Sequence, residues 1–373
     1  MNLSIKEFVD NYLGDIPKPN IDLANLANIF KPSEDNVDHR ERALKLEEKI
    51  LALSGLCPGR DIDIYDVSIN HNGPNYIHTI ECGKKNKETL VLLHGYSGSL
   101  TLFYPMLKEL SKRYHVYCID FLGMGLSSRP EFTCTTAQEA VQYFVSTFEK
   151  WRKTVGIRKY YLGGHSFGGY IASAIAYKNR KGLKGLFLMS PIGVGGTNEN
   201  GVSEEWAESL GWAKTNFWLA YFQVYCKFHE EKITPNELVK KFSPVASFFI
   251  KKYMAGLLNK KQPESAADLL GDFLYEMLMI PGGSEQAVHC ILKPPRICAE
   301  FPLEKVVFNQ ISDIPVYCYY GEDDWNDWSG AQRFSKLSQK KNFKFDFIPK
   351  SGHQVTLQNP EEIVEKMLIN LRA

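Results

Sequence analysis

The sequence predicts an α/β protein with a mostly parallel, doubly wound sheet and a helical segment inserted before its last strands. Short segments that are apolar on both faces alternate with helical patterns, which is typical of a sheet covered by helices on each side. The alternation stops within residues 192–301, where helical patterns continue without a convincing strand. A glycine-rich turn, Gly164 to Gly168, also joins one strand directly to an apolar helix.

Composition indicates a soluble globular protein and excludes few partners. The chain has 373 residues, and its 44 Lys plus Arg nearly balance 43 Asp plus Glu, so no global field favours nucleic acid. The eight cysteines lack C-x-x-C spacing, which favours reduced thiols in a cytosolic-type compartment. Without a secretory signal or a segment of roughly 20 apolar residues, we expect a cytoplasmic protein that binds membranes, lipid droplets or mitochondria only peripherally.

The N-terminal part is predicted to precede the main sheet. Residues 1–38 form an irregular or partly helical arm, and Asp38 to Leu56 repeats apolar residues at helical spacing, which indicates an amphipathic helix. Together they make up a first unit, residues 1–60. Asp61 to Ser68 and Tyr76 to Ile80 then alternate polar and apolar residues around an Asn-Gly-Pro turn, as two antiparallel strands do.

Six further strands are expected after this pair. They are Thr89 to Gly95, His115 to Asp120, Tyr160 to Gly164, Gly185 to Ser190, Pro315 to Tyr320 and Phe343 to Ile348. Helices are predicted at Thr136 to Val155 and Ile363 to Leu371. We therefore predict a core of residues 61–191 and 302–373, and a helical cap, residues 192–301, inserted before the acid-bearing strand and above the carboxyl edge of the sheet.

Ser166 is the candidate nucleophile. It stands in Gly164-His-Ser-Phe-Gly168, between an apolar strand and the helical run that begins near Tyr170. This is the context of a G-x-S-x-G elbow, in which a sharp turn strains the serine backbone and leaves no room for side chains at Gly164 and Gly168.

A serine nucleophile needs a histidine base and an acid that orients the histidine, here in the order Ser, acid, His. His353 follows the last strand in a loop, directly after Gly352. The preceding strand ends in four carboxylates within six positions, among which the G-x-x-D spacing selects Asp324 and keeps Asp327 in reserve. The remaining acids are expected to be solvated loop charges.

The backbone N–H groups of Tyr96 and Phe167 are the candidate oxyanion hole, because Gly95 allows a tight turn at a strand end and Phe167 follows the nucleophile. His94 is predicted to be a structural loop residue, and His165 to pack beside the nucleophile. No His or Cys spacing suits a metal, and no glycine pattern suits a dinucleotide or a nucleotide phosphate. We expect neither a metal nor a cofactor.

Several motifs together resemble the α/β-hydrolase fold family, and within it a phospholipid-acting branch. They are His94-Gly95-Tyr96, Asp120 to Pro130, Phe148 to Arg152, Gly164 to Gly168, Pro302-Leu303 and Tyr320 to Trp325. That branch includes N-acyl-phospholipid lysophospholipases, mitochondrial cardiolipin deacylases, plant lysophosphatidic acid acyltransferases and a lipolysis co-activator. The resemblance implies a serine hydrolase of phospholipid or lysophospholipid acyl esters, without a cofactor.

Two alternatives stay open. One is acyl-CoA-dependent transfer to lysophosphatidic acid, although the His-x-x-x-x-Asp pattern that the resemblance associates with transfer reads His353 to Gln358 here. The other is a non-catalytic, membrane-docked regulator of a lipase, which the intact Ser166 disfavours.

The cap is expected to bind a membrane surface or the substrate itself. Its aromatic candidates are Trp212, Phe217, Trp218, Tyr221 and Phe222. The pairs Lys240-Lys241, Lys251-Lys252 and Lys260-Lys261 could attract anionic lipid. The alternative is that these aromatic side chains form the core of the cap or an acyl pocket, with the lysines as its solvated face.

Overall fold

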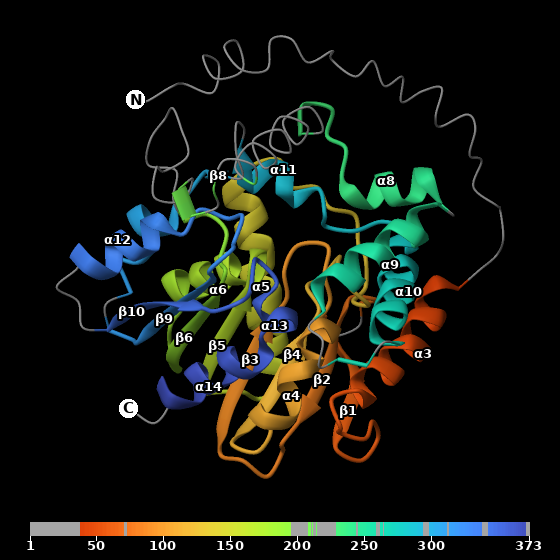
Figure 1. Cartoon of the computed structure of the whole chain (residues 1–373), viewed down its shortest axis with the longest axis horizontal. Coiled ribbons are helices and arrows are strands. Elements are labelled where there is room, and N and C mark those ends of the chain that lie inside the picture. Colours follow the sequence, from red (N-terminus) through yellow and green to blue (C-terminus); the bar gives the residue numbers. More distant parts are fainter. Residues whose placement is uncertain are drawn as a thin grey trace.

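An eight-stranded sheet, in the order β1-β2-β4-β3-β5-β6-β9-β10, forms the centre of the protein (Figure 1). The computed structural model describes residues 38–70, 73–194, 229–243, 245–258, 262–263, 265–293, 298–311, 313–337 and 342–370, together with Glu208, Ser209, Gly211 and Lys214. The strands are β1 (Ile62–Ser68), β2 (Tyr76–Cys82), β3 (Glu88–Leu93), β4 (Tyr114–Ile119), β5 (Tyr160–His165), β6 (Leu183–Met189), β9 (Val316–Gly321) and β10 (Phe343–Ile348). β2 pairs antiparallel with β1 and β4, and all other pairs are parallel. The predicted fold class and the predicted antiparallel pair are confirmed.

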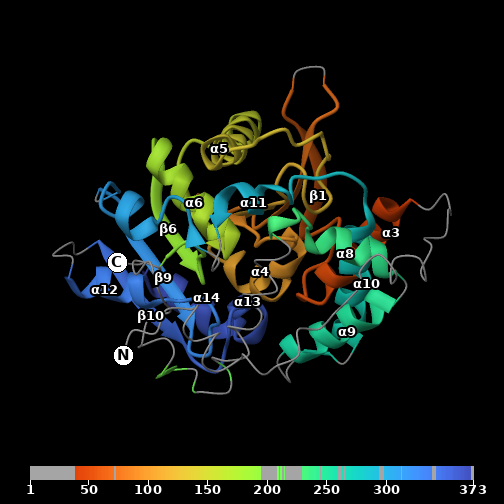
Figure 2. The ribbon, with the colours of Figure 1, turned by 90° about the horizontal axis from the view of Figure 1, so that it is seen from above.

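Helices cover both faces of the sheet. Successive strand residues point to opposite faces, so strands that are apolar throughout give the sheet two apolar faces to cover. The helices of this part are α3 (His39–Ala52), α4 (Tyr104–Leu110), α5 (Ala137–Thr154), α6 (Phe167–Lys178), α12 (Ser329–Leu337), α13 (Val355–Gln358) and α14 (Pro360–Asn370). Val91 and Leu93 of β3 belong to the hydrophobic cluster that contains α5 and α6. Leu90 and Leu92 belong to the cluster that contains α3, α4 and α14. Figure 2 shows α5 and α6 on one side of the sheet and α4 and α14 on the other.

Between β6 and β9, the residues that the structure describes form four α-helices and a short π-helix, η2 (Leu303–Val307). The α-helices are α8 (Pro235–Phe242), α9 (Val245–Leu257), α10 (Ser265–Met279) and α11 (Ala287–Ile291). α10 packs against both α9 and α3, so α3 is joined to this segment. The two-residue strands β7 (Leu292–Lys293) and β8 (Cys298–Ala299) also pair here, which corrects the expectation of a strand-free segment; they are too short to give a sequence pattern. Among the helices that the structure describes, none is both long and apolar enough to cross a bilayer.

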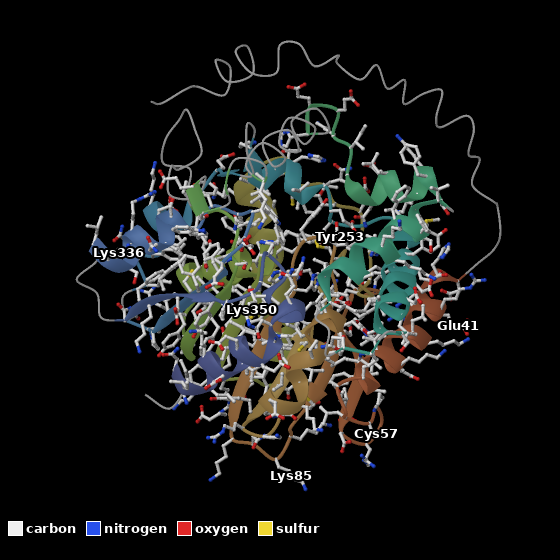
Figure 3. All side chains as sticks on the ribbon, viewed as in Figure 1. Glu41, Cys57, Lys85, Tyr253, Lys336 and Lys350 are labelled. Carbon is white, nitrogen blue, oxygen red and sulfur yellow. The ribbon has the colours of Figure 1, made fainter. Side chains whose placement is uncertain are left out.

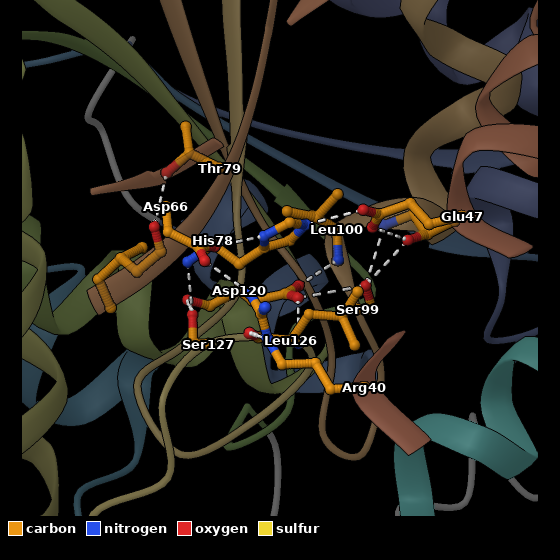
Figure 4. Close-up of polar contacts among 12 residues, drawn as sticks. Arg40, Glu47, Asp66, His78, Thr79, Ser99, Leu100, Asp120, Leu126 and Ser127 are labelled. Carbon is orange, nitrogen blue, oxygen red and sulfur yellow. Dashed lines mark hydrogen bonds and ion pairs between the residues drawn. The ribbon is translucent and has the colours of Figure 1, made fainter. Parts of the chain in front are cut away.

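A buried polar network fastens α3 to the sheet (Figure 4). Glu47 of α3, which is fully buried, contacts His78 Nε2 at 2.7 Å and accepts a hydrogen bond from Thr101 Oγ1 at 2.7 Å. His78 Nδ1 lies 2.8 Å from Asp66. Burial alone would lower the pKa of His78, but the charge of Glu47 and the hydrogen bonds to Asp66 and Glu47 raise it to about 10. His78 is therefore a buried cation at neutral pH.

The same network reaches the loop that follows β3. Asp120, at the end of β4, accepts hydrogen bonds from the N–H groups of Leu100 at 2.7 Å and Leu126 at 2.6 Å. Burial raises the pKa of Asp120, while the nearby His94 and His78 oppose that rise. The buried hydrogen bond from Leu100 to Asp120 thereby holds the segment that connects β3 to α4.

Candidate active site

Ser166 sits at a sharp turn between β5 and α6. Its backbone is in an unusual conformation, φ 54° and ψ −117°, and its N–H donates to the carbonyl of Met189 at 2.9 Å. A Cβ atom on Gly164 would lie 2.2 Å from the carbonyl oxygen of Gly168, and one on Gly168 would lie 2.3 Å from the carbonyl oxygen of Leu93. Strand and helix therefore approach so closely that only glycine fits at these two positions.

His353 lies between Ser166 and Asp324. Its Nδ1 is 2.9 Å from Asp324 Oδ1, and its Nε2 is 2.8 Å from Ser166 Oγ. A carboxylate can only accept, so Nδ1 carries a proton toward Asp324, and Nε2 is the nitrogen that faces the serine hydroxyl. Asp324 is fully buried, and Ser166 and His353 are each 8% exposed. The three side chains thus form one hydrogen-bonded line.

The other carboxylates of the same loop have different partners. Asp327, the reserve candidate, accepts from the N–H of Ser329 at 2.9 Å and so caps the start of α12. Glu322 accepts from the N–H of Lys350 at 3.0 Å. Asp323 pairs with Lys214 at 2.8 Å on the surface. Asp324 is the acid of this loop that lies 2.9 Å from His353 Nδ1.

Three further side chains contact the loop that carries His353. Of these, only His165 was predicted from the sequence to lie beside the nucleophile. His165 Nε2 donates to the carbonyl of His353 at 2.8 Å. Burial, together with the proximity of His353, lowers the pKa of His165 to about 3, so this ring stays neutral. Gln358 accepts from the N–H of Gly352 at 2.9 Å, and the ring of Trp325 lies 4.4 Å from that of His353. No sequence signal separates these roles from ordinary loop packing.

The candidate oxyanion donors belong to two segments that meet at Ser166. Phe167 is the first residue of α6, where a backbone N–H has no partner within the helix. Gly95 lies against the elbow, since a Cβ on it would be 3.2 Å from Ser166 Cβ. His94 donates through Nδ1 to the Gly95 carbonyl at 2.7 Å and accepts at Nε2 from the N–H of Phe121 at 3.1 Å. Both nitrogens are thus used in holding the loop that carries Tyr96.

Ser166 and His353 line a cavity of about 570 Å³. Apolar side chains dominate its walls, and many of them come from α9 and α10: Ile250, Tyr253, Met254, Leu257, Leu274 and Leu278. The aromatic candidates of the cap, Trp212, Phe217, Trp218, Tyr221 and Phe222, lie outside the described residues, as do Lys260 and Lys261. The α9 and α10 positions were not among the predicted site residues, although their spacing of three and four residues is a usable signal.

The segment above the sheet is tied to the candidate oxyanion loop. The hydroxyl of Tyr96 donates to the carbonyl of Glu285 at 3.0 Å, and that of Ser97 donates to Asn236 at 3.0 Å. The carboxylate of Glu285 in turn pairs with Arg129 at 2.8 Å, and both side chains are buried. A shift of this segment would therefore be transmitted to the loop next to Ser166.

Comparison with known proteins agrees with this architecture. The family described as the alpha/beta hydrolase fold matches residues 88–360, and the chain belongs to this family. A rice protein named probable 1-acylglycerol-3-phosphate O-acyltransferase is 29% identical over 77% of this chain and 68% of its own length. The human 1-acylglycerol-3-phosphate O-acyltransferase ABHD5 is 26% identical over 76% of this chain and 77% of its own.

Among solved structures, a membrane phospholipase A, described as a bacterial virulence factor, superposes with a TM-score of 0.61 at 19% identity, covering 90% of this chain and 91% of that one. The carboxylesterase CesB from Bacillus subtilis gives a TM-score of 0.59 at 17% identity, over 90% of this chain and 99% of its own. At these identities the likeness concerns the fold.

Proposed function

We propose that the protein is a serine hydrolase that cleaves acyl esters of phospholipids or lysophospholipids. Ser166 is the nucleophile, His353 the proton shuttle and Asp324 the group that orients His353. The observation that carries this proposal is the line of contacts from Asp324 through His353 to Ser166, at 2.9 and 2.8 Å, inside an apolar cavity. Asp327 stays the reserve acid.

The reaction follows from the protonation states in this line. Nε2 of His353 takes the proton of Ser166 as Oγ attacks the ester carbonyl carbon, and Asp324 stabilises the imidazolium that results. The imidazolium then protonates the departing alcohol, which leaves an acyl group on Ser166. Water, deprotonated by His353, attacks this acyl-enzyme and releases the fatty acid with the serine restored.

The oxyanion that forms during each attack requires hydrogen-bond donors fixed in advance. We assign this role to the N–H groups of Tyr96 and Phe167. Support comes from the position of Phe167 at the start of α6, where the helix dipole also favours negative charge, and from the close contact of Gly95 with Ser166.

A lipid substrate fits the character of the cavity. Its walls are mainly aliphatic and suit an acyl chain, whereas a small polar ester would leave most of that surface unused. The names of the rice and human relatives also refer to acyl lipids. We therefore propose a phospholipid or lysophospholipid as the substrate and a membrane surface as a peripheral partner, for a cytoplasmic protein that docks on membranes, lipid droplets or mitochondria. We keep residues 192–301 as the proposed cap over a core of 61–191 and 302–373.

Purified protein tests the assignment. Incubated with a mixed phospholipid extract, it should release free fatty acid, and a fluorophosphonate probe should label it at Ser166. Ser166→Ala should abolish labelling and lower hydrolysis by several orders of magnitude, since triad residues act as a unit. Near-normal hydrolysis by a folded Ser166→Ala protein would refute the role of this serine, and a folded wild type without labelling would favour a non-catalytic regulator of a lipase.

Acyl transfer to lysophosphatidic acid is a second candidate, because both named relatives are called acyltransferases. On this chemistry, the hydroxyl of a lysolipid replaces water in the attack on the acyl-enzyme. The amide of Gln358 offers no carboxylate at the position that the resemblance associates with transfer, and here it holds the Gly352 N–H. We expect fatty acid release to exceed acyl-CoA-dependent esterification; robust esterification that requires Ser166 would reverse this order.

A further inference from the structure

The outer side of α9 carries a row of exposed apolar side chains. The row consists of Val245, Phe248, Phe249 and Tyr253, which are 41%, 56%, 62% and 58% exposed. Offsets of three, four and eight residues place them on one side of an α-helix. Eight large hydrophobic residues are exposed in the described part of the chain, and four of them lie in this row. Such a concentration marks an interaction site rather than scattered surface residues.

The same helix borders the cavity that contains Ser166. Ile250, Met254 and Leu257 of α9 line that cavity from their side of the helix. Tyr253 belongs to both surfaces, because it lines the cavity and is still 58% exposed. Figure 3 labels Tyr253 on α9. The exposed row therefore meets the wall of the cavity at Tyr253.

A cation lies at the border of the row. Lys252 Nζ lies over the ring of Phe248, 5.0 Å from the ring centre, as in a cation–π contact. The neighbouring Lys251 is instead paired with Asp272 of α10 at 2.7 Å. Aromatic side chains bordered by a lysine suit the interface between lipid headgroups and acyl chains.

We propose that the outer side of α9 is the surface by which this protein docks on a phospholipid bilayer, and that acyl chains enter the cavity past Tyr253. The identity of these chains as substrate rests on the proposed function. The bilayer is favoured as the occupant because the exposed row leads into an apolar cavity. An acyl chain moving along that path would exchange one apolar environment for another and would not have to cross water.

Paired variants of the full chain test the docking surface. Phe248→Gln with Phe249→Gln removes the two exposed phenylalanines of the row, and Leu337→Gln with Ile369→Gln removes the exposed Leu337 and Ile369 from α12 and α14. Glutamine keeps the helix and deletes only apolar surface. In flotation with phosphatidylcholine vesicles, the α9 pair should bind at least about tenfold more weakly than wild type, and the control pair should bind normally. Equal binding by the α9 pair and wild type would overturn the proposal.

Lysine variants separate local charge from net charge. With vesicles that also contain phosphatidylserine, Lys252→Gln should lose most of the added affinity and Lys251→Gln little of it. An equal loss in both variants would mean that net charge, and not the α9 surface, responds to anionic lipid. That result would remove Lys252 from the proposal.

Two further measurements keep docking separate from catalysis. All binding assays are repeated on Ser166→Ala protein, so that docking can be observed even if no ester is cleaved. If the enzyme is active, the α9 pair should hydrolyse a short, monomeric ester normally and a vesicle-embedded phospholipid slowly; an equal loss on both would mean that the row supports the cavity walls only. Light scattering without lipid tests whether this surface binds a second copy of the chain instead. If the wild type is a dimer, the α9 pair is a monomer and neither protein binds vesicles, the surface belongs to a dimer interface and the proposal is overturned.

Discussion

The same Asp→Asn substitution, made at two positions three residues apart, tests which carboxylate holds His353. Asp324 is fully buried and contacts His353 Nδ1 at 2.9 Å, whereas Asp327 caps the Ser329 N–H. When Ser166 is deprotonated, His353 becomes a cation beside Asp324. With about 4 Å between the charge centres and an effective dielectric constant of about 20, loss of the carboxylate charge costs about 4 kcal/mol, or roughly 10³-fold in rate.

The orientation of the new amide can add to this loss. Asp324 Oδ1 also accepts from the N–H of Asn326 at 2.9 Å, which favours keeping the amide oxygen toward His353. If the amide turned its NH₂ group to His353 instead, the ring would be held in the wrong tautomer, and the loss would approach the roughly 10⁴-fold seen for such substitutions. We therefore expect Asp324→Asn to reduce kcat/KM by about 10³- to 10⁴-fold.

Asp327→Asn is the matched control, because asparagine caps a helix about as well as aspartate, and kcat/KM should stay within about twofold of wild type. The assay is hydrolysis of a soluble acyl ester, together with the rate of fluorophosphonate labelling, on variants whose thermal unfolding matches wild type. The opposite result would be a large loss of kcat/KM in Asp327→Asn with little loss in Asp324→Asn. It would show that the loop rearranges in solution and that the distances above do not describe the working enzyme.

Substitutions at three other positions test the surroundings of the site. His78→Leu leaves Glu47 buried without its cation and should lower the free energy of unfolding by about 3–5 kcal/mol, measured in urea. The pKa of His78 is raised to about 10 from its usual value near 6.5, so this stabilisation is fully present below about pH 6.5 and should disappear as pH rises through 10. A difference in the free energy of unfolding between wild type and variant that stays constant from pH 7 to 10 would contradict this prediction. Gln358→Leu should lower kcat severalfold by releasing Gly352, and Gln358→Glu should restore it. Gly168→Ala should abolish activity or folding, because its Cβ would lie 2.3 Å from the Leu93 carbonyl oxygen; a stable, active variant would mean that the elbow can relax.

Patterns of short range carried most of the fold prediction. Apolar strands that alternate with helices indicated the sheet, and the G-x-S-x-G spacing located the turn at Ser166, because both depend on neighbours within a few residues. The two-residue strands β7 and β8 were missed because a pattern of period two needs a longer run. The cluster of the buried Glu47 and His78 with Asp66 could not be predicted either, since it joins three segments that only the folded chain brings together.

The role of Gln358 could not be predicted from the sequence. In the sequence it registers only as a missing carboxylate, five residues after His353. In the structure its amide oxygen accepts from the Gly352 N–H, directly before the histidine, while His165 holds the carbonyl of His353 itself. An aspartate has a side chain one methylene shorter and could reach Gly352 only if α13 moved closer. The glutamine therefore positions the proposed base without adding a negative charge beside it, which is consistent with an enzyme that completes its cycle with water.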